Sequence, residues 1–227
     1  MWKKWNDLPE FMKIPEVLPY WEHLNKKKVQ RTLKRVFDLA ASVFLLILFS
    51  VPMLIIAVRI KSDSDGPVLY RQERVTTYGR TFRIHKFRTM ANDADQTGAA
   101  VTAGDDTRVS KIGAGLRKYR LDELPQLIDV IKGDMSLVGT RPEVVKYAAH
   151  YKPEYYATLL MPAGITSEAS IRYKDEANLL VGREDADAVY IEEILPEKMR
   201  WNLEALKKFS CLQELAVMIR TVLAVIR

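Results

Sequence analysis

The longest apolar pattern in the chain is the uncharged run Leu39–Val58, "LAASVFLLILFSVPMLIIAV". A helix of about 20 apolar residues is long enough to cross the hydrocarbon core of a bilayer. Basic residues flank both ends of this run, and the positive-inside tendency favours both ends on the cytoplasmic side. Pro52 is placed to break the helix near Ser50, because proline removes a backbone donor and clashes with the preceding turn. The pattern therefore fits either a kinked spanning helix or a re-entrant helix, and Asp38 at its start is expected to act as an interfacial cap.

Two terminal segments also have amphipathic character. The N-terminal segment interleaves Trp2, Trp5 and Trp21 with lysines and prolines, which suits the lipid headgroup zone but also an arm docked on the protein. Near the C-terminus, apolar residues recur at steps of three and four over residues 206–226. This pattern predicts either a membrane-surface helix or a helix packed on the core.

Period-two alternation predicts two strands, in residues 68–75 and 80–90, after a turn at Gly66 and Pro67. In the second strand Lys86 and Arg88 project to the same side as two apolar residues, so they form a candidate phosphate clamp. Solvated surface charge is the alternative interpretation. Residues 91–109 are polar and contain glycine, which predicts a loop that orders over a ligand. Its aspartates lack the spacing of a calcium loop.

The segment "RLDELPQLIDVIKGDM", residues 120–135, sets two carboxylates side by side. The apolar spacing that follows predicts a helix from near Asp122 to near Lys132, with Gly133 as its stop. Unpaired backbone N–H groups at a helix start, together with cations just upstream such as Arg117, favour an ionised carboxylate there. Asp122 and Glu123 are therefore candidate catalytic residues, and an N-cap aspartate followed by a first-turn glutamate is the structural alternative.

Charge and motif content narrow the function classes. The formal net charge of +6 indicates an anionic partner without choosing among nucleic acid, acidic lipid and a phosphorylated small molecule. The single cysteine, Cys211, excludes an intramolecular disulfide and favours a reducing, cytosol-facing location. No Walker loop, HExxH or GxSxG motif is present, so zinc and serine hydrolase chemistry lack their usual signatures. Nucleic-acid binding would rest on net charge alone.

The order of segments resembles one family, the bacterial sugar transferases, which are small monotopic polyprenyl-phosphate phosphoglycosyl transferases. The resemblance covers residues 34–166 and is carried by "KRVFDLAASVFLLILFSVPMLIIAVRI", "GPVLYRQERV", "FRIHKFRTM", "KIGAGLRKYRLDELPQLIDVIKGDMSLVGTRPE" and "PAGIT". It implies transfer of a phospho-sugar from a UDP-sugar to undecaprenyl phosphate, with release of UMP, as the first step of membrane glycan assembly. Exopolysaccharide, capsule, O-antigen and glycoprotein glycans are the product classes of such pathways.

The resemblance also implies a mechanism. Asp122 would attack the sugar-bearing phosphate to give an aspartyl-phosphosugar intermediate, which undecaprenyl phosphate then attacks. Mg²⁺ and fixed cations would offset the repulsion between this carboxylate and the diphosphate. Asp122 and Glu123 would hold Mg²⁺, with Glu123 either a metal ligand or a proton-transfer group.

Matching the motifs residue by residue adds further candidates. The implied phosphate-binding cations are Lys86, Arg117 and Arg141, and Ser50 and Pro52 would form the hinge of a re-entrant helix. The chain departs from the common pattern at Thr140, where many members have proline, and in "GITSEASIRYKDEANLL", where many have a Gly-Trp-Ala-Gln-type run. In this divergent stretch Glu168 and Arg172 are candidate sugar or nucleotide contacts.

We therefore expect a mixed α/β, mainly helical fold: a small cytosolic domain with an N-terminal re-entrant membrane helix and amphipathic surface helices. The expected parts are an interfacial arm (1–35), the re-entrant helix (36–60), a catalytic domain (61–190) and C-terminal amphipathic helices (191–227). The expected location is the cytoplasmic face of a bacterial inner membrane, in contact with membrane lipid and, transiently, with other glycan-assembly enzymes. The alternative function is a membrane-anchored scaffold without catalysis, and no nucleic-acid partner is expected.

Overall fold

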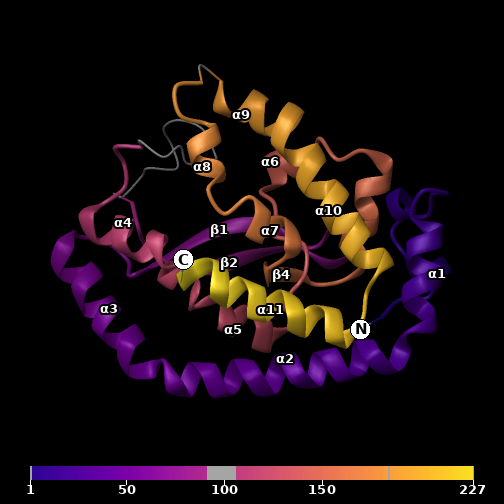
Figure 1. The fold of residues 1–227 in the computed structure, drawn as a ribbon, viewed down its shortest axis with the longest axis horizontal. Helices are drawn as coiled ribbons and strands as arrows, with labels where there is room; N and C mark the ends of the chain where they lie inside the picture. The colour runs from indigo at the N-terminus through magenta and orange to yellow at the C-terminus, as the bar shows by residue number, and fades with distance from the viewer. Residues whose placement is uncertain (1, 91–105, 184, 227) are drawn as a thin grey trace.

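The computed structural model describes residues 2–90, 106–183 and 185–226, and it confirms a mixed α/β fold that is mainly helical (Figure 1). The first half of the chain contains α1 (Leu18–Lys26), α2 (Lys28–Leu48), α3 (Ser50–Asp63), β1 (Leu69–Val75), β2 (Thr81–Phe87), α4 (Lys111–Lys118) and α5 (Gln126–Lys132). The second half contains β3 (Met135–Val138), α6 (Val145–Ala148), β4 (Ala163–Thr166), α7 (Glu168–Arg172), α8 (Glu176–Leu179), α9 (Ala186–Val189), α10 (Leu195–Lys207) and α11 (Cys211–Ile226). Short 3-10 segments lie at Trp5–Asp7, Glu10–Met12, Thr77–Gly79, Leu121–Glu123 and Pro153–Leu160, and a π-helical turn at Tyr190–Ile194 leads into α10.

The strands form two separate two-stranded sheets. β1 and β2 pair antiparallel, with Tyr70 opposite Lys86, which confirms both strands predicted from the alternation. β3 and β4 pair parallel, with Ser136 opposite Gly164. The second sheet joins β3, which precedes Arg141, to β4, which follows it. This pairing positions the segment after β3 that carries Arg141.

α2 and α3 form a bent helix pair along one edge of the molecule (Figure 1). The helices meet at 61° across Phe49, one residue before Ser50, whose hydroxyl donates to the Ile47 carbonyl at 2.8 Å. Within the described residues no single helix has the length and apolar character to cross a bilayer, whereas α2 and α3 taken together do. The bend predicted at Ser50 and Pro52 is therefore present, and its insertion in a membrane stays a prediction.

Polar groups of α2 tie this helix to the elements that follow the paired carboxylates. The Ser136 hydroxyl and the Leu137 amide donate to Asp38 at 2.6 and 3.3 Å, and Lys34 donates to the Val138 carbonyl at 2.9 Å. Arg35 donates to the Val130 carbonyl at 2.6 Å. The expected role of Asp38 as an interfacial cap is wrong. Asp38 lies in the middle of α2, and its buried carboxylate accepts hydrogen bonds from Ser136 and Leu137 of β3.

The N-terminal segment packs on the largest core cluster. Leu8, Met12, Val17 and Leu24 are buried there, and Trp2, Trp5 and Trp21 pack against the same cluster. This packing matches the docked-arm alternative. The expected boundary at residue 35 falls inside α2, because the helix runs without a break from Lys28 to Leu48.

The C-terminal apolar pattern spans two helices rather than one, since α10 ends at Lys207 and α11 begins at Cys211. α11 lies beside α2, and Lys34 pairs with Glu214 at 2.6 Å. Val217 is buried, whereas Leu212, Ile219 and Leu223 are exposed. α11 thus packs on the core by one face and presents an apolar face outward.

Candidate active site

The paired carboxylates lie on a tight turn rather than on the predicted helix. Leu121–Glu123 form a 3-10 turn and α5 begins only at Gln126, while Gly133, at a φ of +87°, ends α5 as predicted. The turn is preceded by Arg120 at a φ of +55°, which is unusual for a residue with a side chain. No side-chain cap bond is formed at this turn. The N-cap interpretation of Asp122 is therefore not supported.

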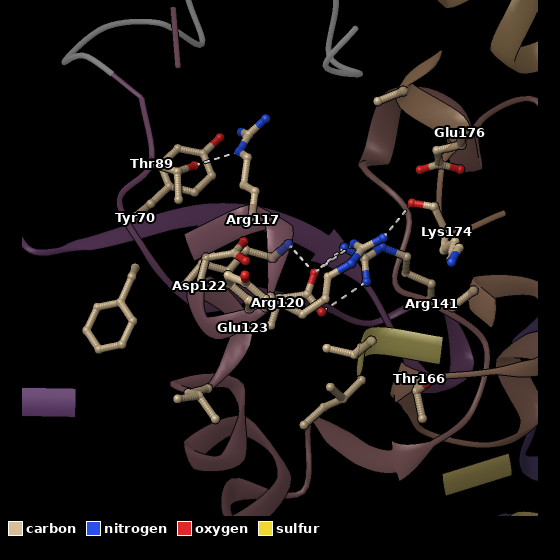
Figure 2. Close-up of a pocket in the computed structure, with 18 of the residues that line it drawn as sticks. Tyr70, Thr89, Arg117, Arg120, Asp122, Glu123, Arg141, Thr166, Lys174 and Glu176 are labelled. Carbon is tan, nitrogen blue, oxygen red and sulfur yellow. Dashed lines mark hydrogen bonds and ion pairs between the residues drawn. The ribbon is translucent and has the colours of Figure 1, made fainter. Parts of the chain in front are cut away.

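Glu123 is neutralised by surrounding cations (Figure 2). Its Oε1 lies 2.5 Å from an Arg141 Nη and 3.0 Å from Lys86 Nζ, and its Oε2 lies 3.4 Å from Arg141. Burial acts to raise the pKa of the Glu123 carboxyl, but Arg141 and Lys86 outweigh burial and hold that pKa well below its ordinary value. Glu123 is thus a fixed anion that holds Lys86 and Arg141 in place.

Asp122 lies in a different environment although it is the adjacent residue. Its side chain is buried, and Oδ1 has no hydrogen-bond partner among the residues that the structure describes. Burial, opposed by Lys86 and reinforced by the negative charge of Glu123, raises the pKa of the Asp122 carboxyl above its ordinary value. A desolvated carboxylate without hydrogen-bond donors is a stronger base and nucleophile than a solvated one.

Arg117 reaches the same turn from α4. Its Nε donates to the Thr89 hydroxyl at 2.9 Å, and burial lowers the pKa of its guanidinium, which stays charged at neutral pH (Figure 2). α4 can approach because Gly113 lies against the Thr89 backbone, where a Cβ would come within 2.1 Å of the carbonyl oxygen. The glycine-containing segment before the carboxylates therefore permits close helix packing, which brings Arg117 to the site.

A cavity of about 1900 Å³ opens over this cluster. Its walls include the carboxylates and their cations, and apolar side chains from the α2–α3 break and from α11, such as Phe49 and Met218. The structure thus brings together five of the predicted site residues at the carboxylate pair, namely Lys86, Arg117, Asp122, Glu123 and Arg141, and a sixth, Arg88, lines the same cavity.

Two other predicted cations have different partners. Arg88 borders the cavity, but its guanidinium donates to the Ser64 and Asp65 carbonyls at the end of α3, at 2.7 and 2.5 Å. Lys86 contacts Glu123, whereas Arg88 follows the last residue of β2 and contacts the segment after α3, so the phosphate clamp stays a prediction. Arg172 is outside the cavity lining and contacts Glu168 at 3.1 Å and the Trp201 ring at 3.7 Å.

Two more predictions concern regions away from the carboxylates. Ser50 and Pro52 begin α3 at the bend, where Phe49 contributes to the cavity wall. The loop predicted over residues 91–109 lies mostly outside the described residues. Of its aspartates, Asp106 is described and pairs with Arg108 at 2.6 Å.

A second polar cluster, which the sequence analysis did not predict, lies in the same cavity. The Tyr190 hydroxyl donates to Glu143 at 2.7 Å, and Lys198 donates to the Tyr190 oxygen and to Glu176, each at 2.9 Å. Arg74 lines the same wall. These residues come from separate elements, and the one available signal was the position of Glu143 two residues after Arg141.

The carboxylates fit a magnesium ion only in part. Within the described part of the chain no three metal-ligating side chains gather at one point. Asp122 offers an oxygen without a partner, whereas both oxygens of Glu123 are engaged by cations. Mg²⁺ is bound in many enzymes by one or two carboxylates together with substrate phosphates and water. The site therefore suits an ion that arrives with a diphosphate.

Comparisons with known proteins identify relatives of this chain. A UDP-N-acetylgalactosamine-undecaprenyl-phosphate N-acetylgalactosaminephosphotransferase of Aeromonas hydrophila is 36% identical over 193 residues, which cover 84% of this chain and 43% of that protein. A UDP-glucose:undecaprenyl-phosphate glucose-1-phosphate transferase of Caulobacter vibrioides is 35% identical over 192 residues, 83% of this chain and 68% of that protein. A protein of the same name in Escherichia coli K12 is 31% identical, with 86% of this chain and 40% of that protein covered.

The chain thus spans less than half the length of two of these three relatives. The profile of the family described as bacterial sugar transferase matches residues 29–227, which include both carboxylates and the cations around them. From this match over most of its length, the chain belongs to the bacterial sugar transferase family.

Proposed function

We propose that this protein is a phosphoglycosyl transferase that moves a phospho-sugar from a UDP-sugar to undecaprenyl phosphate and releases UMP. The observation that carries the proposal is the contrast between two adjacent carboxylates: Glu123 is engaged by two cations, and Asp122 is buried with an oxygen that has no partner among the described residues. The proposal is also supported by the names of the relatives, which mention both a UDP-sugar and undecaprenyl phosphate.

In the first half of the cycle, an Asp122 oxygen attacks the phosphorus that bears the sugar. A bond forms between that oxygen and phosphorus, the bridging P–O bond of the diphosphate breaks, and UMP leaves with the bonding electrons. Lys86, Arg117 and Arg141 are cations on the same cavity wall and stabilise the negative charge that develops on the phosphates. The product is an aspartyl-phosphosugar.

In the second half, a phosphate oxygen of undecaprenyl phosphate attacks the same phosphorus. The new diphosphate bond forms as the bond to Asp122 breaks, which restores the carboxylate. Because Glu123 is held anionic between Arg141 and Lys86, its role in our mechanism is to orient these cations. A proton-transfer role for Glu123 would require it to leave these partners.

Asp122 and the donor diphosphate would hold Mg²⁺, with Glu123 as a second ligand after one of its cations moves to the substrate. A bound Mg²⁺ would supply positive charge that offsets the repulsion between the carboxylate and the diphosphate.

The proposed location is the cytoplasmic face of a bacterial inner membrane. The bent α2–α3 pair carries exposed apolar side chains on both sides of the break, among them Phe44, Ile47, Leu54 and Ile55. A re-entrant pair inserted in one leaflet would hold the cavity at headgroup level, where the acceptor phosphate lies. The cavity wall formed by Phe49 and Met218 would then face the polyprenyl chain.

The test is nucleotide release by the full chain in nanodiscs with a panel of UDP-sugars, undecaprenyl phosphate and Mg²⁺. We expect wild type to release UMP, and Asp122→Asn to reduce the rate by at least about a thousandfold while the protein stays folded. Release of UDP would indicate ordinary glycosyl transfer. Binding of donor without release of either nucleotide would contradict catalysis and favour a scaffold role.

A further inference from the structure

The cavity extends well beyond the carboxylates that perform the proposed chemistry. The cavity lining also includes Arg74, Glu143, Glu176, Tyr190 and Lys198, which we call the distal cluster. Glu143, Tyr190 and Lys198 are almost fully buried, with exposed fractions of 5%, 2% and 3%. A cavity of about 1900 Å³ has ample room for a group on each side of a bound diphosphate.

The distal cluster is a connected network. Lys198 lies between Glu176 and the Tyr190 oxygen, and Tyr190 in turn donates to Glu143. Lys198 is also 3.8 Å from Glu143. Such a network holds its donors and acceptors in fixed positions, which is what recognition of a defined pattern of hydroxyl groups requires.

One donor in the distal cluster has no partner. Arg74 donates through Nη1 to the Pro142 carbonyl at 3.2 Å, but its buried Nε has no hydrogen-bond partner among the described residues. A buried N–H without an acceptor is energetically unfavourable, so an orphan donor on a cavity wall points to a ligand oxygen. Arg74 is held next to Glu143 by the pairing of its backbone with Val144.

The charge of the distal cluster favours a neutral ligand over a phosphate. It combines the cations Arg74 and Lys198 with the carboxylates Glu143 and Glu176, so its charges balance. The wall near Asp122 instead holds four cations and two carboxylates: Lys86, Arg117, Arg120, Arg141, Asp122 and Glu123. Phosphates belong at the cationic wall, and the distal cluster suits a neutral group rich in hydroxyls.

The position of Glu176 selects between the two neutral ends of the donor. Arg120, which precedes the Asp122 turn, donates to the Lys174 carbonyl at 3.0 Å and so ties the segment before Glu176 to the nucleophile (Figure 2). Our proposed mechanism has Asp122 attack the sugar-bearing phosphate. The sugar is then joined to the reacting phosphorus through a single oxygen, whereas the uridine lies beyond the second phosphate.

We propose that the distal cluster is the binding site for the sugar ring of the donor, with Glu176 and Lys198 as specificity-determining residues. Their side chains would accept from and donate to ring hydroxyl or acetamido groups, and the Arg74 Nε would donate to a ring oxygen substituent. This inference rests on the proposed function, because it takes a UDP-sugar as the ligand.

The test compares Glu176→Gln and Lys198→Met with Arg200→Ala, a control on the same helix as Lys198 whose exposed side chain pairs with Glu197. For each full-length variant in nanodiscs, kcat/KM for UMP release is measured with UDP-glucose and UDP-N-acetylgalactosamine. The dissociation constant of UMP, which lacks the sugar, is measured by calorimetry, and the melting temperature is recorded.

We expect Glu176→Gln to lower kcat/KM for the preferred donor by about tenfold and to change the ratio between the two donors, with UMP binding unchanged. Lys198→Met should act in the same direction, and the control should match wild type. Equal losses for both donors together with weaker UMP binding would overturn the proposal in favour of a nucleotide site. Equal losses that follow the melting temperature, or no change in Glu176→Gln, would also overturn it.

Failure of the proposed function would look different. Wild type would then release no UMP from either donor, and calorimetry with the intact UDP-sugars would replace the kinetic measurement. A Glu176→Gln variant that loses affinity for one UDP-sugar but keeps its affinity for UMP would still support the sugar site.

Discussion

The two polar clusters in the cavity lining, one around Asp122 and the other the distal cluster, differ in their balance of buried charge. At the Asp122 end, cations outnumber carboxylates, and one carboxylate keeps an unpartnered oxygen. At the distal cluster, charges balance and the Lys198 ammonium contacts Tyr190 and Glu176. An excess of fixed cations prepares a site for phosphate, whereas a charge-balanced network with one donor left over prepares a site for neutral polar groups. Our proposals thus assign the reaction to the cluster with excess cations and sugar recognition to the charge-balanced cluster of the same cavity.

The most severe disruption of the cationic end is Arg141→Ala. This change removes both hydrogen bonds to Glu123 and one phosphate-binding cation. We expect kcat for UMP release to fall by about a thousandfold, in the upper range for loss of one electrostatic contact in a transition state. Steady-state kinetics with a folded variant measures the effect, and a loss below tenfold would contradict the role given to Arg141.

Lys86→Met tests whether the cationic end keeps Asp122 ionised. Lys86 lowers the pKa of the Asp122 carboxyl, against the rise caused by burial, so its removal should raise that pKa further. The attacking form is the carboxylate, so activity should be lost at a higher pH than in wild type as the solution is acidified. We also expect kcat to fall by about a hundredfold near neutral pH. A pH profile of kcat/KM with an unshifted acidic limb would count against this account.

Arg120 joins the two ends, and its backbone and side chain can be tested separately. Its φ of +55° strains a residue with a Cβ, and its side chain holds the Lys174 carbonyl. The free energy of unfolding of Arg120→Gly should exceed that of Arg120→Ala by about 1 kcal/mol, because glycine adopts this conformation without strain. Both variants lack the side chain and should lose about tenfold in kcat/KM. Recovery of activity in the glycine variant alone would show that strain, not the contact with Lys174, governs the turn.

Arg88→Met tests whether Arg88 belongs to the phosphate-binding cations of the cavity. Arg88 donates to carbonyls at the end of α3, so its loss should reduce the free energy of unfolding by about 2 kcal/mol. The KM for the donor should stay within about twofold of wild type, since the guanidinium donates to the Ser64 and Asp65 carbonyls. A large rise in KM at unchanged stability would instead support the prediction that Lys86 and Arg88 together bind a phosphate.

The smallest effect is expected from Arg172→Ala. Arg172 lies outside the cavity lining and pairs with Glu168 on the same helix, at 47% side-chain exposure. Exposed ion pairs of this kind contribute about 0 to 1 kcal/mol. We expect donor kinetics within about twofold of wild type, and a changed donor preference would place Arg172 in the sugar site after all.

Local patterns in the sequence predicted local structure well. The alternation in residues 68–90 predicted β1 and β2, and Gly133 predicted the end of α5. Pro52 predicted a bend, which occurs at Phe49, within one helical turn of the proline. The start of α5 was placed too early, because Arg120 adopts a left-handed conformation and the carboxylates form a 3-10 turn. Propensity alone does not reveal such a strained residue.

Tertiary contacts explain what the sequence could not predict. Asp38 looked like a cap because it precedes an apolar run, yet it accepts from Ser136, nearly a hundred positions along the chain. Arg88 is two positions after Lys86 and would lie on the same face of a continuous strand, but β2 ends at Phe87, between the two residues. The distal cluster draws on four separate segments whose residues have no common spacing. The resemblance to a family supplied Arg141, whereas the strand alternation already indicated Lys86 and the position just upstream of the carboxylates indicated Arg117.

The most direct test of the central claim is mass spectrometry of the full chain in nanodiscs, incubated with UDP-sugar and Mg²⁺ but without undecaprenyl phosphate. The account predicts a mass increase equal to one phospho-sugar, mapped by peptide analysis to Asp122 and removed when the acceptor is added. Asp122→Asn should show no such increase. An adduct on another residue, or acceptor-dependent UMP release by wild type with no adduct under any quench, would contradict a nucleophilic role for Asp122.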